Sequence, residues 1–304
     1  MRALWWIKRD FRLDDNPALQ AALASCTYLI PVFFLEPRVY LAPDASAFHL
    51  QAQLTALADL QSSLRAIGAE LLVIKADLPQ GFIGLQQQLA FTHIYSHEET
   101  GAGITYQRDI AVARWCKQQN IMWYEFPQSG VIRRLRSRDN RSQIIAKRLL
   151  GSEPLPPPTH IPQPDIRHLN ASVIPPLDAL APKLLDKRIH WPSVQVVSER
   201  RAQRTLDSFL QERSLRYRGG ISSPNKAFLC GSRLSPHIAW GTVSLRRIFF
   251  RLHQRLSELE DEQESGVDNL LAQRWQKSLE SFSSRLFWRD HFVQRLESAS
   301  YMEF

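Results

Sequence analysis

The stretch that decides the fold reads Leu4-Trp5-Trp6-Ile7-Lys8-Arg9-Asp10-Phe11-Arg12-Leu13-Asp14-Asp15-Asn16-Pro17-Ala18-Leu19. Residues 3–7 form a short apolar run that ends at charged residues, which is the pattern of a buried strand. The polar residues 14–16 and Pro17 then mark the start of a helix that continues through Leu23. The sequence therefore predicts a strand, a loop and a helix, in that order.

The same unit recurs along the first 126 residues. Further apolar strands are expected at 28–35, 70–74, 93–95 and 121–126, and helices at 46–67, near Leu85 and at 105–118. Five strands that alternate with helices predict a doubly wound parallel sheet, with ligands beyond the carboxyl ends of the strands. Neither a G-x-G-x-x-G motif nor a P-loop occurs, so neither kind of nucleotide site is predicted.

Composition limits the functional classes. The 304 residues carry 38 Lys and Arg against 30 Asp and Glu, a net charge of +8 that suits a polyanion such as nucleic acid. A basic protein without such a partner is the alternative. The three cysteines are far apart, which argues against a zinc site or a disulfide framework and fits the cytoplasm. We expect no metal, no signal peptide and no membrane span.

A basic cluster and a proline-rich stretch separate the two halves of the chain. The cluster comprises Arg133, Arg134, Arg136, Arg138, Arg141, Lys147 and Arg148, with Asp139 as its one acidic residue. It could follow phosphates or form a solvated helix face. Prolines then recur from Pro154 to Pro192, a composition typical of a stiff linker. We expect an α/β domain at 1–130, a basic helix and linker at 131–198, and a second domain at 199–304.

The second domain reads as all-helical. Helices are expected at 199–212, 234–240, 244–256 and 270–296, with residues 258–264 as an exposed acidic connection. The last helix is apolar on much of its surface, at Phe287, Trp288, Phe292 and Leu296. Such a helix needs more partners than this domain supplies, so we expect further sequence downstream.

Two segments resemble the photolyase/cryptochrome family, and the resemblance covers essentially the whole chain. Residues 4–19 are similar to its Arg-Asp-x-Arg-x-x-Asp-Asn-x-Ala-Leu signature. Residues 232–244, Ser-Arg-Leu-Ser-Pro-His-Ile-Ala-Trp-Gly-Thr-Val-Ser, are similar to its flavin-phosphate segment Thr-Ser-x-Leu-Ser-Pro-x-Leu-x-x-Gly. Residues 97–101, 108–109 and 284–289 resemble further family stretches. The chain is identified as a member that lacks part of the C-terminal FAD-binding domain.

The resemblance implies an FAD site in the helical domain. The residues it assigns to FAD are Tyr217, Gly231, Ser232, Arg233, Leu234, Ser235 and Phe282. Ser232 and Ser235 stand at the entry to a helix with Pro236 in its first turn, where free backbone amides bind phosphate. Arg233 adds a charge, and Tyr217 and Phe282 add flat apolar surface. An ordinary helix cap is the alternative reading of the serines.

Two other sites follow from the resemblance. Glu98 and Glu99 follow a predicted strand and could hydrogen-bond an antenna chromophore of the folate or flavin/deazaflavin type, or simply cap a helix. Arg285, Trp288 and Arg289 correspond to the DNA-contacting stretch, in which Trp288 could stack on a flipped base or pack in the core.

The implied function is light-dependent repair of pyrimidine dimers in DNA by electron transfer from FAD. For the full-length parent this is a carbon–carbon lyase activity. Three departures leave alternatives open. Gly231 replaces a threonine, Phe282 a tryptophan and Arg285 a glutamate of common photolyases. The later family segment, with its flavin-facing aspartate and electron-transfer tryptophans, has no counterpart. A cryptochrome-like photoreceptor without repair activity and an inactive fragment are the alternatives. The catalytic residues, dimer type and oligomeric state stay open.

Overall fold

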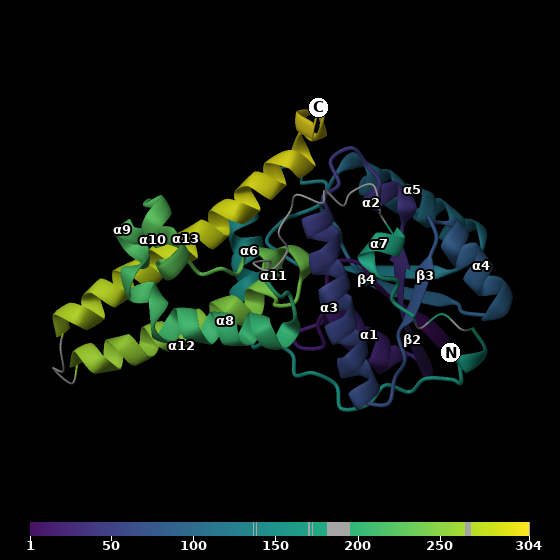
Figure 1. Ribbon diagram of the computed structural model, residues 1–304, viewed down its shortest axis with the longest axis horizontal. Helices are drawn as coiled ribbons and strands as arrows, with labels where there is room; N and C mark the ends of the chain where they lie inside the picture. Colours follow the sequence, from purple (N-terminus) through teal and green to yellow (C-terminus); the bar gives the residue numbers. More distant parts are fainter. Residues whose placement is uncertain are drawn as a thin grey trace.

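The computed structural model describes residues 1–135, 137, 139–169, 171, 173–180, 195–264 and 269–303. A five-stranded sheet lies in one half of the molecule and a group of helices extends from it (Figure 1). The strands are β1 (Arg2–Ile7), β2 (Tyr28–Leu35), β3 (Leu72–Lys75), β4 (His93–His97) and β5 (Met122–Phe126). Every pair is parallel and the order is β3-β2-β1-β4-β5, which confirms the predicted fold class.

Helices cover both faces of this sheet. They are α1 (Pro17–Ser25), α2 (Pro37–Tyr40), α3 (Ala47–Ala66), α4 (Gln80–Gln88) and α5 (Gly103–Gln118). Neighbouring residues of a strand point to opposite faces, so Trp5 packs with α1 and α3 and Trp6 packs with Phe82 of α4 and Trp115 of α5. Both tryptophans are fully buried. The run Trp5-Trp6 therefore fills the cores on both sides of the sheet.

The connection between the halves runs along the α/β half. It contains α6 (Arg141–Leu150), η1 (Arg167–Leu169) and α7 (Leu177–Leu180). The amides of Asp15 and Leu29 donate to the carbonyls of Leu155 and Pro162, at 2.9 and 2.7 Å. The prolines therefore lie in an extended strap that is hydrogen-bonded to the domain. Arg136, Arg138, Pro182 and Pro192 of the expected cluster and linker lie outside the described residues.

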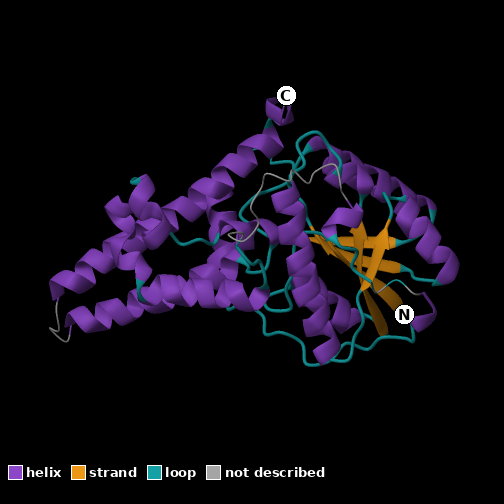
Figure 2. Ribbon diagram, in the orientation of Figure 1, coloured by secondary structure: helices purple, strands orange, loops and turns teal. Residues whose placement is uncertain are grey.

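The described residues from 199 onward form helices joined by short loops, as predicted (Figure 2). The elements are α8 (Glu199–Gln211), η4 (Arg213–Arg216), α9 (Tyr217–Gly220), α10 (Pro224–Cys230), α11 (Ser235–Trp240), α12 (Leu245–Glu264), α13 (Asn269–Ser298) and η5 (Ser300–Glu303). The expected acidic connection at 258–264 is wrong, because these residues form the end of α12. Glu258 and Glu262 both pair with Arg255, which supports the helix there.

Hydrogen bonds from the opening stretch join the two halves. The backbone amides of Leu13 and Asp14 donate to the carboxylate of Glu199, each at 2.9 Å. Arg12 donates to the carbonyl of Gly241 at 2.9 Å. Gly241 has a left-handed backbone (φ 63°), and a Cβ there would collide with the carbonyl of Arg9. The loop after β1 is thus built into the interface between the halves.

Among the described helices, none combines the length and the apolar character that crossing a membrane requires.

Candidate functional site

A cavity opens at the carboxyl ends of β1, β2 and β4. Its walls come from Lys8 and Arg9 after β1, Glu36 after β2, Glu99 after β4 and Arg108 on α5. Phe34, Tyr40, His49 and Trp240 also line it, and Trp240 belongs to the helical half. This is the edge at which a doubly wound sheet binds ligands, and the structure has a cavity there.

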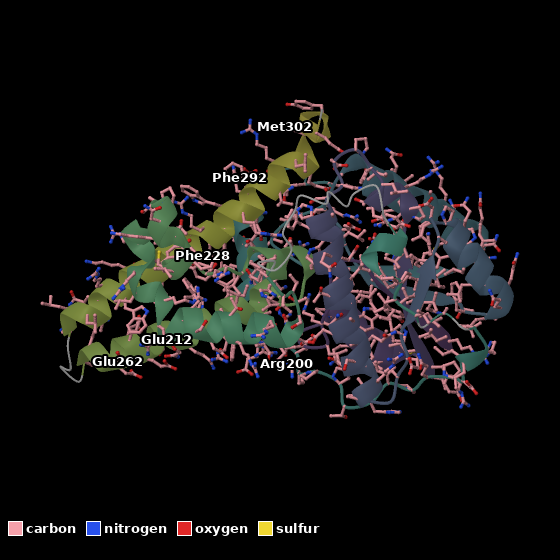
Figure 3. The ribbon with its side chains drawn as sticks, in the orientation of Figure 1. Arg200, Glu212, Phe228, Glu262, Phe292 and Met302 are labelled. Carbon is pink, nitrogen blue, oxygen red and sulfur yellow. The ribbon has the colours of Figure 1, made fainter. Side chains whose placement is uncertain are left out.

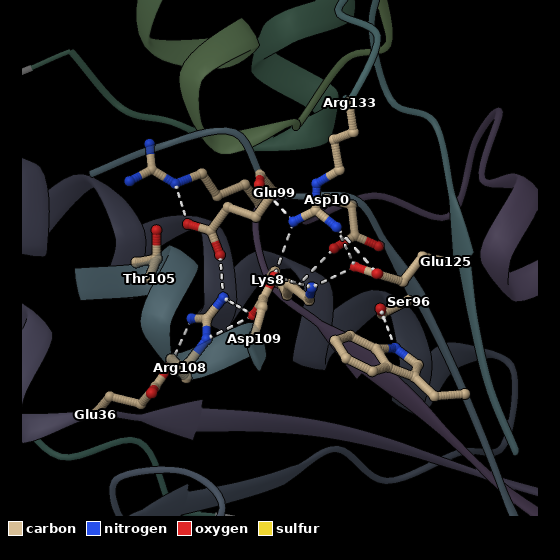
Figure 4. Close-up of polar contacts among 12 residues, drawn as sticks. Lys8, Asp10, Glu36, Ser96, Glu99, Thr105, Arg108, Asp109, Glu125 and Arg133 are labelled. Carbon is tan, nitrogen blue, oxygen red and sulfur yellow. Dashed lines mark hydrogen bonds and ion pairs between the residues drawn. The ribbon is translucent and has the colours of Figure 1, made fainter. Parts of the chain in front are cut away.

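The polar wall of the cavity is a network of buried ion pairs (Figure 4). Arg108 contacts Glu36 at 2.8 Å, Glu99 at 2.5 Å and Asp109 at 2.8 Å. Arg9 adds a second cation to Glu99 at 3.0 Å. The ion pairs hold the carboxylates in fixed positions, which suits recognition of a ring with hydrogen-bonding edges.

A second layer lies behind this wall. Lys8 contacts Asp109 at 3.0 Å and Glu125 at 3.2 Å, and its ammonium lies 4.3 Å from the centre of the Trp6 ring. Arg133 reaches the same two carboxylates at 3.1 and 3.0 Å. Arg133 belongs to the basic cluster for which the sequence suggested phosphate binding. Its guanidinium is committed to internal carboxylates, which favours a structural role at that position.

Two glutamates of the network have opposite pKa shifts. Burial raises the pKa of Glu36 to about 7, although Arg108 acts to lower it. Burial also acts to raise the pKa of Glu99, but Arg108, Arg9 and Lys8 together lower it to about 2. Near neutral pH, Glu99 is therefore a carboxylate, whereas Glu36 exchanges a proton. The cavity offers one fixed acceptor and one side chain that both donates and accepts.

The raised pKa of Glu36 predicts a pH-dependent stability. The folded chain binds a proton at Glu36 more tightly than the unfolded chain does, so stability is lost as pH rises from about 4.5 to about 7, by about 3 kcal/mol. In Glu36→Gln this loss should disappear, and urea unfolding between pH 5 and pH 8 measures the difference. Glu70→Gln, at a partly exposed glutamate, is the control. If the free energy of unfolding of Glu36→Gln changed with pH as much as that of the parent chain, the raised pKa of Glu36 would be contradicted.

The predicted antenna residues Glu98 and Glu99 both line a second cavity between the halves, together with Gln128, Ser129 and Arg289. Glu99 also lines the cavity above, whereas Glu98 does not. Burial raises the pKa of Glu98, with Arg133 and Arg148 acting against it. Glu36 and Arg108 were missed as site residues. The signal for Glu36 was its position directly after a strand, the same signal that drew attention to Glu98.

In the segment 231–235, three backbone carbonyl groups accept hydrogen bonds, whereas three backbone amides lack an acceptor among the described residues. Arg213 donates to the carbonyls of Gly231 and Ser232, and Gln195 donates to the carbonyl of Arg233 at 2.9 Å. In the part of the chain that the structure describes, the amides of Ser232, Arg233 and Ser235 have no acceptor. Leu234 is fully buried and fixes the segment in the helical core. Three free amides before and at the start of α11 fit a phosphate ligand.

The remaining predicted flavin residues pack together. Tyr217 and Phe282 are buried with their ring centres 5.7 Å apart, and Phe209 lies 4.7 Å from Phe282. Tyr217 is the first residue of α9, which packs against α10, and α10 leads into Gly231. The side chain of Arg233 does not join them, because its guanidinium lies 4.1 Å from the centre of the Phe228 ring.

The three residues predicted to contact DNA divide into two settings on α13. Trp288 is about half exposed, and the guanidinium of Arg285 lies 4.6 Å from the centre of its ring. Arg289 instead pairs with the buried carboxylate of Asp290 at 2.7 Å. Trp288 is therefore available for stacking on the molecular surface. Arg289 instead contacts Asp290, which accepts a hydrogen bond from Gly130 between the halves.

Comparisons with known proteins agree on one family. A family model described as DNA photolyase matches residues 3–146. Cryptochrome-2 of Gallus gallus is 29% identical over 123 residues, which is 40% of this chain and 20% of that protein. A deoxyribodipyrimidine photo-lyase of Synechococcus sp. is 34% identical over 97 residues, which is 32% of this chain and 20% of that protein. An uncharacterized 31.6 kDa protein of Synechococcus sp. strain PCC 6716 is 22% identical over 94% of this chain and 98% of its own length.

Solved structures share the fold over nearly the whole chain. A Synechocystis cryptochrome superposes with a TM-score of 0.75 at 19% identity, covering 97% of this chain and 61% of that one. A Sulfolobus tokodaii photolyase described with two FAD molecules gives a TM-score of 0.64 at 20% identity, covering 98% of this chain and 60% of that one. The chain thus spans about three fifths of the length of these two solved relatives.

Proposed function

The chain belongs to the photolyase/cryptochrome family, and on that premise we propose that it binds FAD in its helical half and contributes to light-driven repair of pyrimidine dimers in DNA. The observation that carries the proposal is the segment 231–235, whose free amides fit the pyrophosphate of FAD. We also propose that residues 1–130 and 199–304 act as the antenna and FAD-binding domains, in the cytoplasm.

In this proposal the backbone of Gly231–Ser235 holds the phosphates. Ser232 and Ser235 add hydroxyl donors, Leu234 anchors the segment, and Arg233 contributes its amide rather than its guanidinium. Tyr217 and Phe282 form a buried aromatic wall beside the segment. Bound FAD supplies the light-driven electron transfer, and the protein supplies binding and orientation.

The cavity at the sheet edge suits an antenna chromophore. Folates and flavins are flat rings that carry donors and acceptors on their edges, and the cavity combines aromatic side chains with the fixed carboxylate of Glu99 and the exchanging carboxyl of Glu36. Because Glu99 lines this cavity and Glu98 does not, we assign chromophore contact to Glu99.

DNA is the proposed partner. The net charge of +8 favours a polyanion, and the exposed Trp288 on α13 offers a face on which an extruded base could stack. A cryptochrome-like photoreceptor is the second candidate, favoured by one observation. Arg285 lies over Trp288 at the position where common photolyases have a glutamate, and a guanidinium cannot accept a hydrogen bond from a base.

A repair assay separates the two candidates. The purified chain, supplied with FAD and a reductant, is incubated with ultraviolet-irradiated oligothymidine in blue light and in the dark. Repair predicts that absorbance at 260 nm returns only in the light, as dimers revert to thymines. A chain that holds flavin but restores no absorbance under illumination contradicts repair and supports the photoreceptor.

A further inference from the structure

A groove on the outer side of the helical half gathers positive charge. It lies between α8 and α10 and is lined by Arg201, Thr205, Ser208, Arg213, Phe228 and Arg233, and we name it the α8–α10 groove. No aspartate or glutamate is among the lining residues that the structure describes. Phe228, labelled in Figure 3, is 64% exposed, which is unusual for an aromatic side chain beside a core.

The sequence of α8 builds one wall of this groove. Arg201, Thr205 and Ser208 are spaced by four and three residues and so share one face of the helix. The neighbouring face, with Leu206 and Phe209, is buried in the helical core. The amphipathic pattern of α8 therefore presents a guanidinium and two hydroxyls along the groove.

Arg213 and Arg233 form the other wall and are held in place. Arg213 donates to the carbonyls of Thr205 at 2.9 Å and Ser232 at 3.3 Å, and to the hydroxyl of Ser208 at 3.2 Å. Arg233 has a left-handed backbone (φ 58°) and its guanidinium lies over the Phe228 ring. Both positions are thus set before any ligand arrives, which lowers the entropic cost of binding.

These charges are not neutralised within the described chain. Neither Arg201 nor Arg233 has an ion pair with any described carboxylate. Burial lowers the pKa of Arg213, and the positive charge of Arg233 lowers it further, so the two guanidinium groups repel each other. An anion between them would relieve this repulsion and gain charge-assisted hydrogen bonds.

The geometry favours a particular anion. A terminal phosphate carries nearly two negative charges, whereas each internal phosphate of a nucleic acid carries one, so three guanidinium groups match the terminal phosphate better. Phe228 adds an exposed flat ring beside the charges, and aromatic side chains bind nucleobases by stacking. We propose that the α8–α10 groove binds a nucleotide, with Arg201, Arg213 and Arg233 on its terminal phosphate and Phe228 against its base.

This site uses other chemical groups than the proposed flavin site. Arg213 and Gln195 occupy the carbonyl groups of residues 231–233, and both side chains line the groove. The free amides of Ser232, Arg233 and Ser235, which we assign to FAD, are a different set of groups. Of these three residues only Arg233 lines the groove, and it does so with its guanidinium over Phe228. The nucleotide site therefore does not rest on the proposed function.

The test is calorimetric titration of the full chain with 5′-AMP, adenosine and inorganic phosphate. AMP should bind at least tenfold more tightly than adenosine or phosphate, because only AMP meets both the arginines and Phe228. Arg201→Ala and Phe228→Ala should each weaken AMP at least tenfold. Arg200→Ala is the matched control, since Arg200 precedes Arg201 on α8, is exposed and does not line the groove. It should change affinity less than twofold.

Two further arms complete the experiment. Octathymidine with and without a 5′-phosphate tests the source of the nucleotide. If 5′-phosphorylated octathymidine binds more tightly than AMP, and only with its phosphate, the natural ligand is a strand end. If 5′-phosphorylated octathymidine binds as tightly as AMP or more weakly, the natural ligand is a free nucleotide. Equal affinity of AMP for Arg201→Ala and Arg200→Ala would overturn the proposal, as would octathymidine that binds equally with and without the phosphate. The amount of flavin retained per chain is measured on the same samples. We expect it to be unchanged in Arg201→Ala, which would show that a loss of AMP affinity does not come from failure of the flavin site.

Discussion

Replacing Arg108 by methionine is expected to lower the free energy of unfolding by about 3–5 kcal/mol at pH 8, because a buried ion pair that loses one partner leaves an uncompensated charge. Arg108 is the only described cation that contacts Glu36, and it also contacts Glu99 and Asp109. Methionine preserves an unbranched apolar stem beside Trp6, whose ring centre lies 5.1 Å from the guanidinium. The loss of stability therefore measures the contribution of the Arg108 charge rather than that of its packing.

The deficit should shrink at pH 5. The pKa of Glu36 is about 7 with Arg108 present, and removal of a neighbouring cation raises it further, so the variant takes up a proton that the unfolded chain releases. Denaturant unfolding followed by circular dichroism at pH 5 and pH 8 measures both effects. Arg114→Met, at an exposed arginine on the same helix, is the control and should cost less than about 0.5 kcal/mol. If Arg108→Met and Arg114→Met were equally stable at pH 8, the stabilising role of the Arg108 ion pairs would be contradicted.

Ser235→Glu is expected to lower FAD affinity at least tenfold while leaving the fold intact. Ser235 is exposed and is the first residue of α11, a position at which a carboxylate stabilises a helix by about 0.3–1 kcal/mol. The same carboxylate would compete with the pyrophosphate for the free amides and repel its charge. Stability and cofactor binding should therefore change in opposite directions, which a general loss of folding cannot produce.

The measurement is FAD retained per chain after gel filtration, with the melting temperature recorded on the same samples. Ser62→Glu, at an exposed serine of α3, is the matched control and should retain as much FAD as the parent chain. Ser235→Ala removes only the hydroxyl and should lose less FAD than Ser235→Glu. If Ser235→Glu retained FAD like the control, the phosphates would not lie at this segment.

The parallel sheet could be predicted because its signal is local. Each strand is a short apolar run, and alternation with helices leaves few topologies. The cavity at the carboxyl ends also follows from the fold class. The identity of its polar wall did not follow, because Glu36 and Glu99 meet at Arg108, which reaches them from α5 across separations of 72 and 9 residues. Pairings of this kind depend on how the helix packs over the sheet.

Other features depended on contacts between distant parts of the chain. Glu98 and Glu99 looked like one antenna site in the sequence, yet only Glu99 lines the cavity at the sheet edge, while both line the cavity between the halves. The acidic stretch at 258–264 looked like a connection, although glutamate favours helices and Arg255 lies within reach of two of its carboxylates. The guanidinium of Arg233 was expected on the cofactor, and its left-handed backbone directs it to Phe228.

Whether this chain binds flavin through its helical half can be decided by the absorbance spectrum of the freshly purified protein, with the bound chromophore released and identified. We expect a flavin spectrum, and close to one FAD per chain after addition of FAD and gel filtration. A protein that stays colourless under saturating FAD, while folded by circular dichroism, would contradict that expectation.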